Sequence, residues 1–206
     1  MMLPILLLGP AGSGKDTAAR ALAQRYGGSV YHLADPIRAT LDTPVWQEAL
    51  GRQMASGEHP ALVRRRALQA VGDSFRALHP YALVDALVAR VDQDGVSTVM
   101  VPDVRLPDEL ARFRSRWPGC LAVYCDTPEV KRQVRLVDRD GAPLDTQTST
   151  HVTESAVLSL REQADWVWHN GATWEVAWAR LATWVHSQQS RERFPAAGGD
   201  RGGRGV

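Results

Sequence analysis

Cysteine is scarce in this chain, and neither sign of charge dominates it. The 206 residues include two cysteines, and the formal net charge is +1. So small an imbalance gives no bulk electrostatic reason to expect nucleic acid or an anionic membrane as a partner. Cys120 and Cys125 lie an odd number of residues apart in one apolar run, so on a strand they point to opposite faces and do not pair. We therefore expect a reduced, cytoplasmic protein.

Long apolar runs are also missing. The run Leu3–Leu8 is far shorter than the roughly 20 residues that cross a bilayer. No basic segment precedes it and a glycine-rich loop follows directly, which does not match a signal peptide. We expect no membrane partner.

Short apolar runs alternate with segments of helical periodicity along most of the chain. Buried strands are expected at residues 3–8, 29–33, 96–101, 120–125 and 166–169. Helices are expected at residues 14–26, 36–50, 60–71, 81–91, 107–117, 127–137, 151–163 and 173–186. This alternation predicts an α/β fold of three layers, a five-stranded parallel sheet with helices on both faces. Ligands of such sheets bind at the carboxyl ends of the strands.

The stretch LLGPAGSGKDT links the first expected strand to the first expected helix. Gly9, Gly14 and Lys15 have the spacing of a phosphate-binding P-loop, G-x-x-x-x-G-K-[ST]. Asp16 stands at the Ser/Thr position, and Thr17 follows one residue late. The glycines let backbone N–H groups turn toward phosphate oxygens, and the helix N-terminus attracts the same anion. Lys15 is also one of only two lysines in an arginine-rich chain, which supports a specific role.

The whole loop is the expected binding site for the ATP phosphates, and the sequence therefore predicts a P-loop NTPase fold. The set is Gly9, Ala11, Gly12, Ser13, Gly14, Lys15, Asp16 and Thr17. Asp16 can ligate Mg²⁺ directly or through water, and Thr17 can supply a hydroxyl instead. The structural alternative for Asp16 is a carboxylate that only interacts favourably with the helix dipole. The alternative for the loop as a whole is a glycine-rich turn that binds no ligand.

Polar residues also follow two other expected strands. Asp35 and Arg38 come after strand 29–33, and Asp103 and Arg105 come after strand 96–101. Asp103 stands where a carboxylate can hold the shell of Mg²⁺, and Arg105 has a planar fork suited to a phosphate. The structural alternatives are that Asp35 and Asp103 cap the helix or loop that follows each of them, and that Arg105 forms an ion pair with the acidic residues after it.

Five stretches, in this order, resemble the phage-type deoxynucleoside monophosphate kinases, a branch of the P-loop nucleoside monophosphate kinase superfamily. They are GSGKDT, LADPIR, RRRALQAVGDSFR, VMVPDVRLPDE and HVTES, and together they cover most of residues 3–185. Thr153 replaces the family's Ser, and Leu106 stands where an aromatic residue is frequent. The resemblance implies ATP- and Mg²⁺-dependent phosphorylation of a deoxynucleoside monophosphate to the diphosphate.

The resemblance also implies a domain layout and further site residues. A kinase-like domain covers residues 1–189, with an acceptor-binding helical insert at 35–92 and a lid at 127–150. The composition of residues 190–206, rich in Gly and Arg with little to bury, separately predicts a disordered tail without a counterpart in the family. The catalytic set is Lys15 with the lid arginines Arg132, Arg135 and Arg139, and the metal set is Asp16 and Asp103. The acceptor-binding set is Asp35, Arg38, Arg65, Arg66, Gln69, Arg76, Asp103, Arg105, His151 and Glu154. Asn170 is expected at the adenine. A solvated helix face is the alternative for each helical arginine.

Two other functions stay open at this point. One is a P-loop kinase for another phosphorylated small molecule or a modified nucleotide. The other is a non-catalytic nucleotide-binding module, against which the retention of Lys15, Asp103 and the lid arginines counts. The base, the choice between deoxyribose and ribose, and the oligomeric state, including a homodimer, are left undetermined by the pattern.

Overall fold

The five predicted strands form one sheet. The computed structural model describes residues 3–141 and 152–193 of the 206-residue chain. All strand pairs are parallel, in the order β2-β3-β1-β4-β5. The strands are β1 (Leu3–Leu8), β2 (Ser29–Val30), β3 (Thr98–Val101), β4 (Leu121–Asp126) and β5 (Trp166–His169). The predicted five-stranded parallel α/β fold is confirmed.

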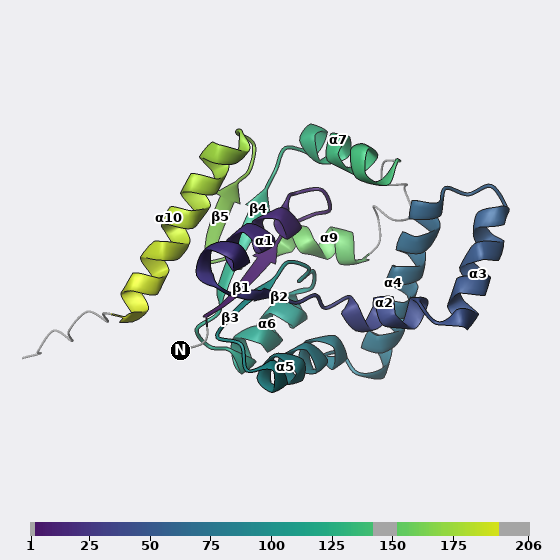
Figure 1. The fold of residues 1–206 in the computed structure, drawn as a ribbon, viewed down its shortest axis with the longest axis horizontal. Helices are drawn as coiled ribbons and strands as arrows, with labels where there is room; N and C mark the ends of the chain where they lie inside the picture. Colours follow the sequence, from purple (N-terminus) through teal and green to yellow (C-terminus); the bar gives the residue numbers. More distant parts are fainter. Residues whose placement is uncertain (1–2, 142–151, 194–206) are drawn as a thin grey trace, which may run out of the picture.

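Helices cover both faces of the sheet (Figure 1). One face packs against α1 (Lys15–Tyr26) and α10 (Trp174–Arg193). The other face packs against α5 (Ala82–Asp94), α6 (Pro107–Arg116) and α9 (Val152–Ser159). The helices α2 (Asp35–Leu41), α3 (Pro44–Ala55) and α4 (Pro60–Leu78), which we call the insert, extend beside the sheet, and α7 (Glu129–Asp140) lies above the loop between β1 and α1. The predicted insert at 35–92 also includes most of α5, which packs on the sheet.

The core follows the period-two alternation of strand side chains. In β1, Ile5 and Leu7 pack toward α1 and α10, whereas Leu6 and Leu8 pack toward the opposite helices. All four are fully buried, as expected of a central parallel strand. Cys120 and Cys125 are free and belong to opposite core clusters, which confirms that they face away from each other.

Element boundaries differ from the prediction where turns intervene. β2 ends at Val30, and the helix expected at 36–50 is divided into α2 and α3, with Pro44 starting the second one. α7 continues to Asp140, where Gly141 adopts the left-handed conformation that ends helices. α10 runs to Arg193, past the expected start of the tail; residues 142–151 and 194–206 lie outside the described residues. None of the described helices has the length and apolar character needed to cross a bilayer.

Candidate active site at the P-loop

The P-loop is built on three glycines whose backbone conformations would strain other residues. Gly9, Gly12 and Gly14 have φ angles of 125°, 76° and 89°. The loop turns tightly enough for the Lys15 ammonium to donate back to a loop carbonyl at 2.7 Å and to Ser13 Oγ at 3.2 Å. Lys15 is only 5 % exposed. Its ammonium is therefore held over the loop, beside a helix N-terminus that attracts anions.

The Ser13 carbonyl anchors the loop to the segments that follow β4 and β5. Thr127 Oγ1 donates to this carbonyl at 3.0 Å and Asn170 Nδ2 donates at 2.9 Å, and both side chains are buried. A Cβ at Gly14 would come within 2.7 Å of Asn170 Nδ2, so only glycine allows this approach. Asn170 therefore holds the loop in place, and its expected contact with adenine stays a prediction.

Helix α7 lies across the P-loop with arginines facing inward. Arg132 Nη1 donates to the Ala11 carbonyl and Arg135 Nη1 donates to the Gly12 carbonyl, each at 3.3 Å. The backbones also approach closely, since a Cβ at Gly12 would lie 2.7 Å from the Arg132 carbonyl oxygen. The helix that sequence reasoning treats as a lid is thus docked on the phosphate loop.

The outward face of α7 carries exposed valines among its charged residues, unlike an ordinary surface helix, which buries its apolar side chains. Val130, Val134 and Val137 are exposed, and Leu136 is the buried residue of this helix. The inward face docks mainly through guanidinium groups.

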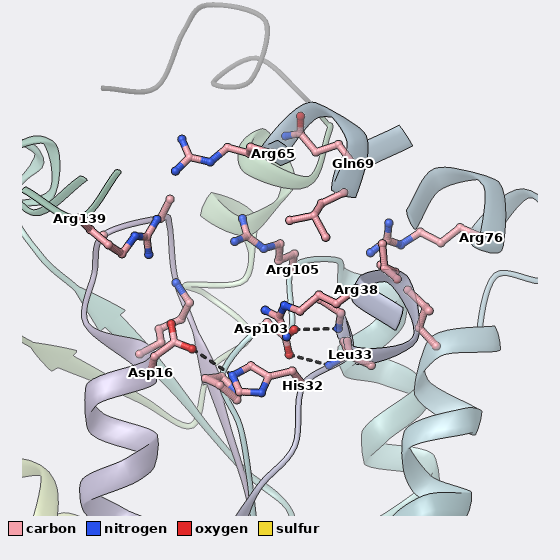
Figure 2. Close-up of a pocket in the computed structure, with 18 residues that line it drawn as sticks. Asp16, His32, Leu33, Arg38, Arg65, Gln69, Arg76, Asp103, Arg105 and Arg139 are labelled. Carbon is pink, nitrogen blue, oxygen red and sulfur yellow. Dashed lines mark hydrogen bonds and ion pairs between the residues drawn. The ribbon is translucent and has the colours of Figure 1, made fainter. Parts of the chain in front are cut away.

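A cavity of about 250 Å³ opens between the P-loop, the insert and α7 (Figure 2). Polar side chains from separate parts of the chain converge on it. They are Lys15, Asp16, His32, Arg38, Arg65, Gln69, Arg76, Asp103, Arg105 and Arg139. The structure thus brings most of the expected acceptor residues to the P-loop lysine.

Asp16, rather than Thr17, faces this cavity. Asp16 lines it, whereas Thr17 is exposed and does not. Asp16 Oδ1 lies 3.1 Å from His32 Nε2. This hydrogen bond lowers the pKa of Asp16 and raises the pKa of His32, with burial opposing both shifts. The interaction therefore favours an ionised carboxylate next to the phosphate loop.

Asp103 is tied to the chain that follows β2. Its Oδ1 accepts from the Leu33 N–H at 2.9 Å, and its Oδ2 accepts from the Ala34 N–H at 3.0 Å (Figure 2). These bonds fix the backbone of the turn that follows β2. Burial raises the pKa of Asp103, while His32 and the two N–H groups oppose that shift.

The donor set fits Mg²⁺ held jointly by protein and substrate. Within residues 3–141 and 152–193, no group of three or more His, Cys, Asp or Glu side chains forms a ready-made metal site. Mg²⁺ commonly uses one or two carboxylates together with substrate phosphates and water. Asp16, whose side chain is 49 % exposed, suits that arrangement. Both Asp103 oxygens already accept hydrogen bonds, and its role as a ligand stays a prediction.

One carboxylate connects the insert to α7. Arg65 of α4 and Arg139 of α7 both bond to Asp140, the last residue of α7. Arg65 and Asp140 are largely buried, with side chains 17 % and 15 % exposed. The Arg139 hydrogen bond holds the pKa of Asp140 below its usual value. Two arginines that line the cavity are therefore paired with a carboxylate outside its lining.

The remaining cavity arginines come from α2, α4 and the loop after β3. Arg38 Nη1 bonds to Asp35 Oδ1 at 3.0 Å, and Asp35 itself lines a neighbouring cavity of about 200 Å³. Arg76 bonds to Glu109 Oε1 through Nε at 3.1 Å and Nη2 at 2.9 Å. Arg105 projects into the cavity from the β3–α6 loop (Figure 2).

Two of the expected acceptor residues, Asp35 and Arg66, do not line this cavity. Arg66 pairs with Glu58 at 2.9 Å and does not line the cavity. The reason is helical phase: Gln69 and Arg76 follow Arg65 by one and three turns and share its face, whereas Arg66 is turned aside. His151 lies outside the described residues, and so does the side chain of Glu154.

His32, Glu109 and Asp140 are the residues that sequence reasoning did not assign to the site. His32 falls inside an expected strand, so the pattern gave it no chemical weight. Glu109 and Asp140 stand near helix ends, where acidic residues have an ordinary structural explanation. Arg76, which Glu109 holds, and Arg65, which Asp140 holds, are distant in sequence and give no local signal.

Comparison with known proteins identifies the fold of this chain. No family model and no curated protein sequence matches this chain. Among solved structures, TT1252 from Thermus thermophilus has a TM-score of 0.57 and 20% identity, over 91% of this chain and 97% of that one. Shikimate kinase from Acinetobacter baumannii, solved with shikimate, has a TM-score of 0.53 and 18% identity, over 94% and 96%. A sugar kinase from Janibacter sp. HTCC2649 has a TM-score of 0.53 and 18% identity, over 90% and 95%. The chain therefore has the fold of the P-loop kinases.

Proposed function

We propose that this protein is a deoxynucleoside monophosphate kinase, which uses ATP and Mg²⁺ to convert its acceptor to the diphosphate. The composition of the P-loop cavity carries the proposal. The cavity that contains Lys15 is also lined by five arginines, from α2, α4, α7 and the loop after β3. The P-loop and Arg139 of α7 suffice for the donor phosphates, so the four arginines of α2, α4 and the loop after β3 support a second anionic group, on the acceptor.

On the donor side, the chain supplies positive charge and orientation. Backbone N–H groups of the loop and the N-terminus of α1 bind phosphate oxygens, and the Lys15 ammonium offsets the charge of the transferred phosphoryl group. Mg²⁺ held by Asp16 would offset the charge of the donor phosphates. Docked α7 adds Arg139 and excludes water, which protects ATP from hydrolysis.

A phosphate acceptor fits the state of the cavity carboxylates better than a hydroxyl acceptor does. A hydroxyl must lose a proton to a nearby base, whereas a monophosphate already presents an ionised oxygen. Among the described residues that line the cavity, the carboxylates are Asp16, bonded to His32, and Asp103, bonded to two backbone N–H groups. A monophosphate acceptor requires no base from either carboxylate.

The nucleoside part of the proposal rests on the family resemblance and on one cavity residue. The five motifs resemble those of deoxynucleoside monophosphate kinases. Gln69 lies in the cavity wall one helical turn from Arg65. Its amide can both donate to and accept from the edge of a base, while the arginines take the phosphate.

A kinase for another anionic small molecule is the second candidate. A shikimate kinase and a sugar kinase share this fold, so the fold itself admits acceptors that are not nucleotides. Arginines bind carboxylates as readily as phosphates, so an acidic metabolite also suits the cavity.

The test is ADP formation from ATP and Mg²⁺ with a panel of acceptors. The panel contains dAMP, dGMP, dCMP, dTMP, the ribonucleotides, shikimate, gluconate and no acceptor, with Lys15→Ala as the control. Turnover with a deoxynucleoside monophosphate, lost in the control, supports the proposal and gives the base preference. Turnover restricted to a non-nucleotide acceptor replaces it with the second candidate. ATP binding without any ADP formation refutes both and leaves a nucleotide-binding module.

A further inference from the structure

Glu109, in the first turn of α6, is a buried carboxylate surrounded by hydrogen-bond donors. Its side chain is 2 % exposed. Oε1 accepts from Arg76 Nε at 3.1 Å and from Arg76 Nη2 at 2.9 Å. Oε2 accepts from the backbone N–H groups of Arg105 at 2.9 Å and Leu106 at 3.1 Å. Four donors therefore meet two oxygens, and each oxygen accepts twice.

Only a carboxylate satisfies these four donors. A glutamine has the same shape but offers one oxygen and one NH₂ group, and that group would face donors on whichever side it turned. The mismatch would leave either the Arg76 guanidinium or a buried backbone N–H without its partner. The chemistry of the surroundings thus specifies glutamate, beyond the preference of helix N-termini for negative charge.

Glu109 joins two separate walls of the cavity. Arg76 comes from the last turns of α4, and Arg105 comes from the loop between β3 and α6. Both side chains line the cavity (Figure 2), while Glu109 itself does not. The carboxylate accepts hydrogen bonds from the guanidinium of Arg76 and from the backbone N–H of Arg105. It therefore sets the position of the Arg76 guanidinium relative to the backbone from which the Arg105 side chain projects.

A glycine on α4 makes room for this arrangement. A Cβ at Gly72 would lie 2.9 Å from Arg76 Nη1 and 3.1 Å from Ile37 Cδ1. Glycine in the interior of a helix costs about 1 kcal/mol relative to alanine. At this position the missing side chain lets the guanidinium lie back along the helix and reach Glu109.

We propose that Glu109 is the positioning residue of the acceptor site, which fixes Arg76 and Arg105 as a preformed pair for the acceptor phosphate. The inference rests on the proposed function, since it assigns both arginines to the acceptor. Glu109 touches no substrate; it acts through the two arginines. Preformed cations bind an anion more tightly because little ordering remains to be done on binding.

The principal test compares Glu109→Gln with Asp85→Asn. Asp85 provides a matched control, because its carboxylate bonds bidentately to Arg112 of the same helix α6, at 2.9 and 3.0 Å, away from the cavity. Calorimetry measures the Kd of ATP and, separately, of each nucleoside monophosphate without ATP. Glu109→Gln is expected to weaken monophosphate binding about tenfold or more, the effect of losing a charged hydrogen bond, with ATP binding within about twofold of wild type. Asp85→Asn is expected to change neither constant.

Steady-state kinetics supply a second readout that general destabilisation does not mimic. Glu109→Gln should raise KM for the acceptor while KM for ATP stays near the wild-type value. A loss of structure would instead lower the active fraction, reducing kcat with both KM values unchanged.

Gly72→Ala is the second variant, and it serves if Glu109→Gln fails to fold. It leaves the carboxylate intact and displaces the guanidinium of Arg76, with a smaller adjustment of Ile37. The same selective weakening of monophosphate binding is expected, and the double variant should lose less than the sum of the two single effects because both act on one contact.

The outcomes separate this inference from the proposed function. Selective loss of monophosphate binding in the variants supports the inference even if no monophosphate is turned over, a result that would refute the kinase proposal alone. Equal weakening of ATP and monophosphate, or no change, overturns the inference while turnover by wild type still supports the kinase. If wild type binds no monophosphate at all, the cavity is not an acceptor site and the inference fails with it.

Discussion

The close approach of α7 to the P-loop can be tested with two matched glycines. Gly12 has a φ of 76°, and a Cβ there would lie 2.7 Å from the Arg132 carbonyl oxygen. Gly27, at the end of α1, has a nearly equal φ of 69°, but a Cβ there would meet nothing within 4 Å. Replacing each glycine by alanine therefore imposes similar backbone strain, and only Gly12→Ala adds a steric overlap with α7.

The expected magnitudes follow from these two contributions. Left-handed strain costs about 1–2 kcal/mol for a residue with a Cβ, which is the whole expected effect of Gly27→Ala. Overpacking adds about 1–3 kcal/mol, so Gly12→Ala should destabilise the protein by roughly 2–5 kcal/mol. The overlap is with a backbone carbonyl, so no change of rotamer relieves it. The added effect cannot exceed the free energy that docks α7, because the helix can detach instead.

Urea denaturation of both variants, with hydrogen exchange of the α7 amides, measures this difference. The expected result is a larger loss of unfolding free energy in Gly12→Ala and faster exchange confined to α7. Equal losses in the two variants, with unchanged exchange in α7, would show that α7 does not rest on the P-loop in solution, and the argument for a docked lid would fail.

Three further predictions concern single side chains of the site. Asp16→Asn should lower turnover by about tenfold or more and raise the Mg²⁺ concentration needed for the half-maximal rate. Thr17→Ala should change neither quantity. The reverse result would assign the metal to Thr17. Asn170→Ala removes a buried hydrogen bond to the P-loop and should cost about 1–2 kcal/mol of stability. It should also raise KM for ATP and KM for GTP equally. A change in the preference for ATP over GTP would instead indicate that Asn170 contacts the base. Asp140 has a lowered pKa because Arg139 and Arg65 favour its charged form. Its contribution to the stability of the protein is therefore fully present above the unfolded pKa of about 3.9 and is lost as the pH falls through the folded pKa. The stability difference between wild type and Asp140→Asn should therefore be constant near neutral pH and shrink below about pH 3.9, and a difference that does not depend on pH would contradict the ion pairs.

The sequence predicts the strands and the P-loop well because their signals are local. A continuous apolar run indicates a buried strand, and the glycine and lysine spacing of residues 9–15 requires no knowledge of distant contacts. The same holds for the inward arginines of α7, which recur at helical spacing.

The pairing of charges across the cavity has no such local signal. Arg76 and Glu109 are 33 residues apart, and Arg65 and Asp140 are 75 residues apart. Nothing in either neighbourhood distinguishes these residues from solvated charges, so only the packing of the insert against α6 and α7 brings them together. The predicted end of β2 at residue 33 was wrong for a related reason, because the apolar pattern gives no sign that the Leu33 N–H donates to the distant Asp103 carboxylate.

The polar docking of α7 has a thermodynamic consequence. Heat capacity changes in proteins arise mainly from the hydration of apolar surface. In α7 the valines are already exposed to water, and Leu136 is the one buried apolar side chain that the described helix itself contributes. Opening this helix should therefore have a small heat capacity change, and the enthalpy of opening should vary little with temperature. The enthalpy of exchanging the guanidinium–carbonyl hydrogen bonds of such a lid for hydrogen bonds to water would change little with temperature. The stability of the core beneath it, in contrast, has the curved temperature dependence that apolar burial produces.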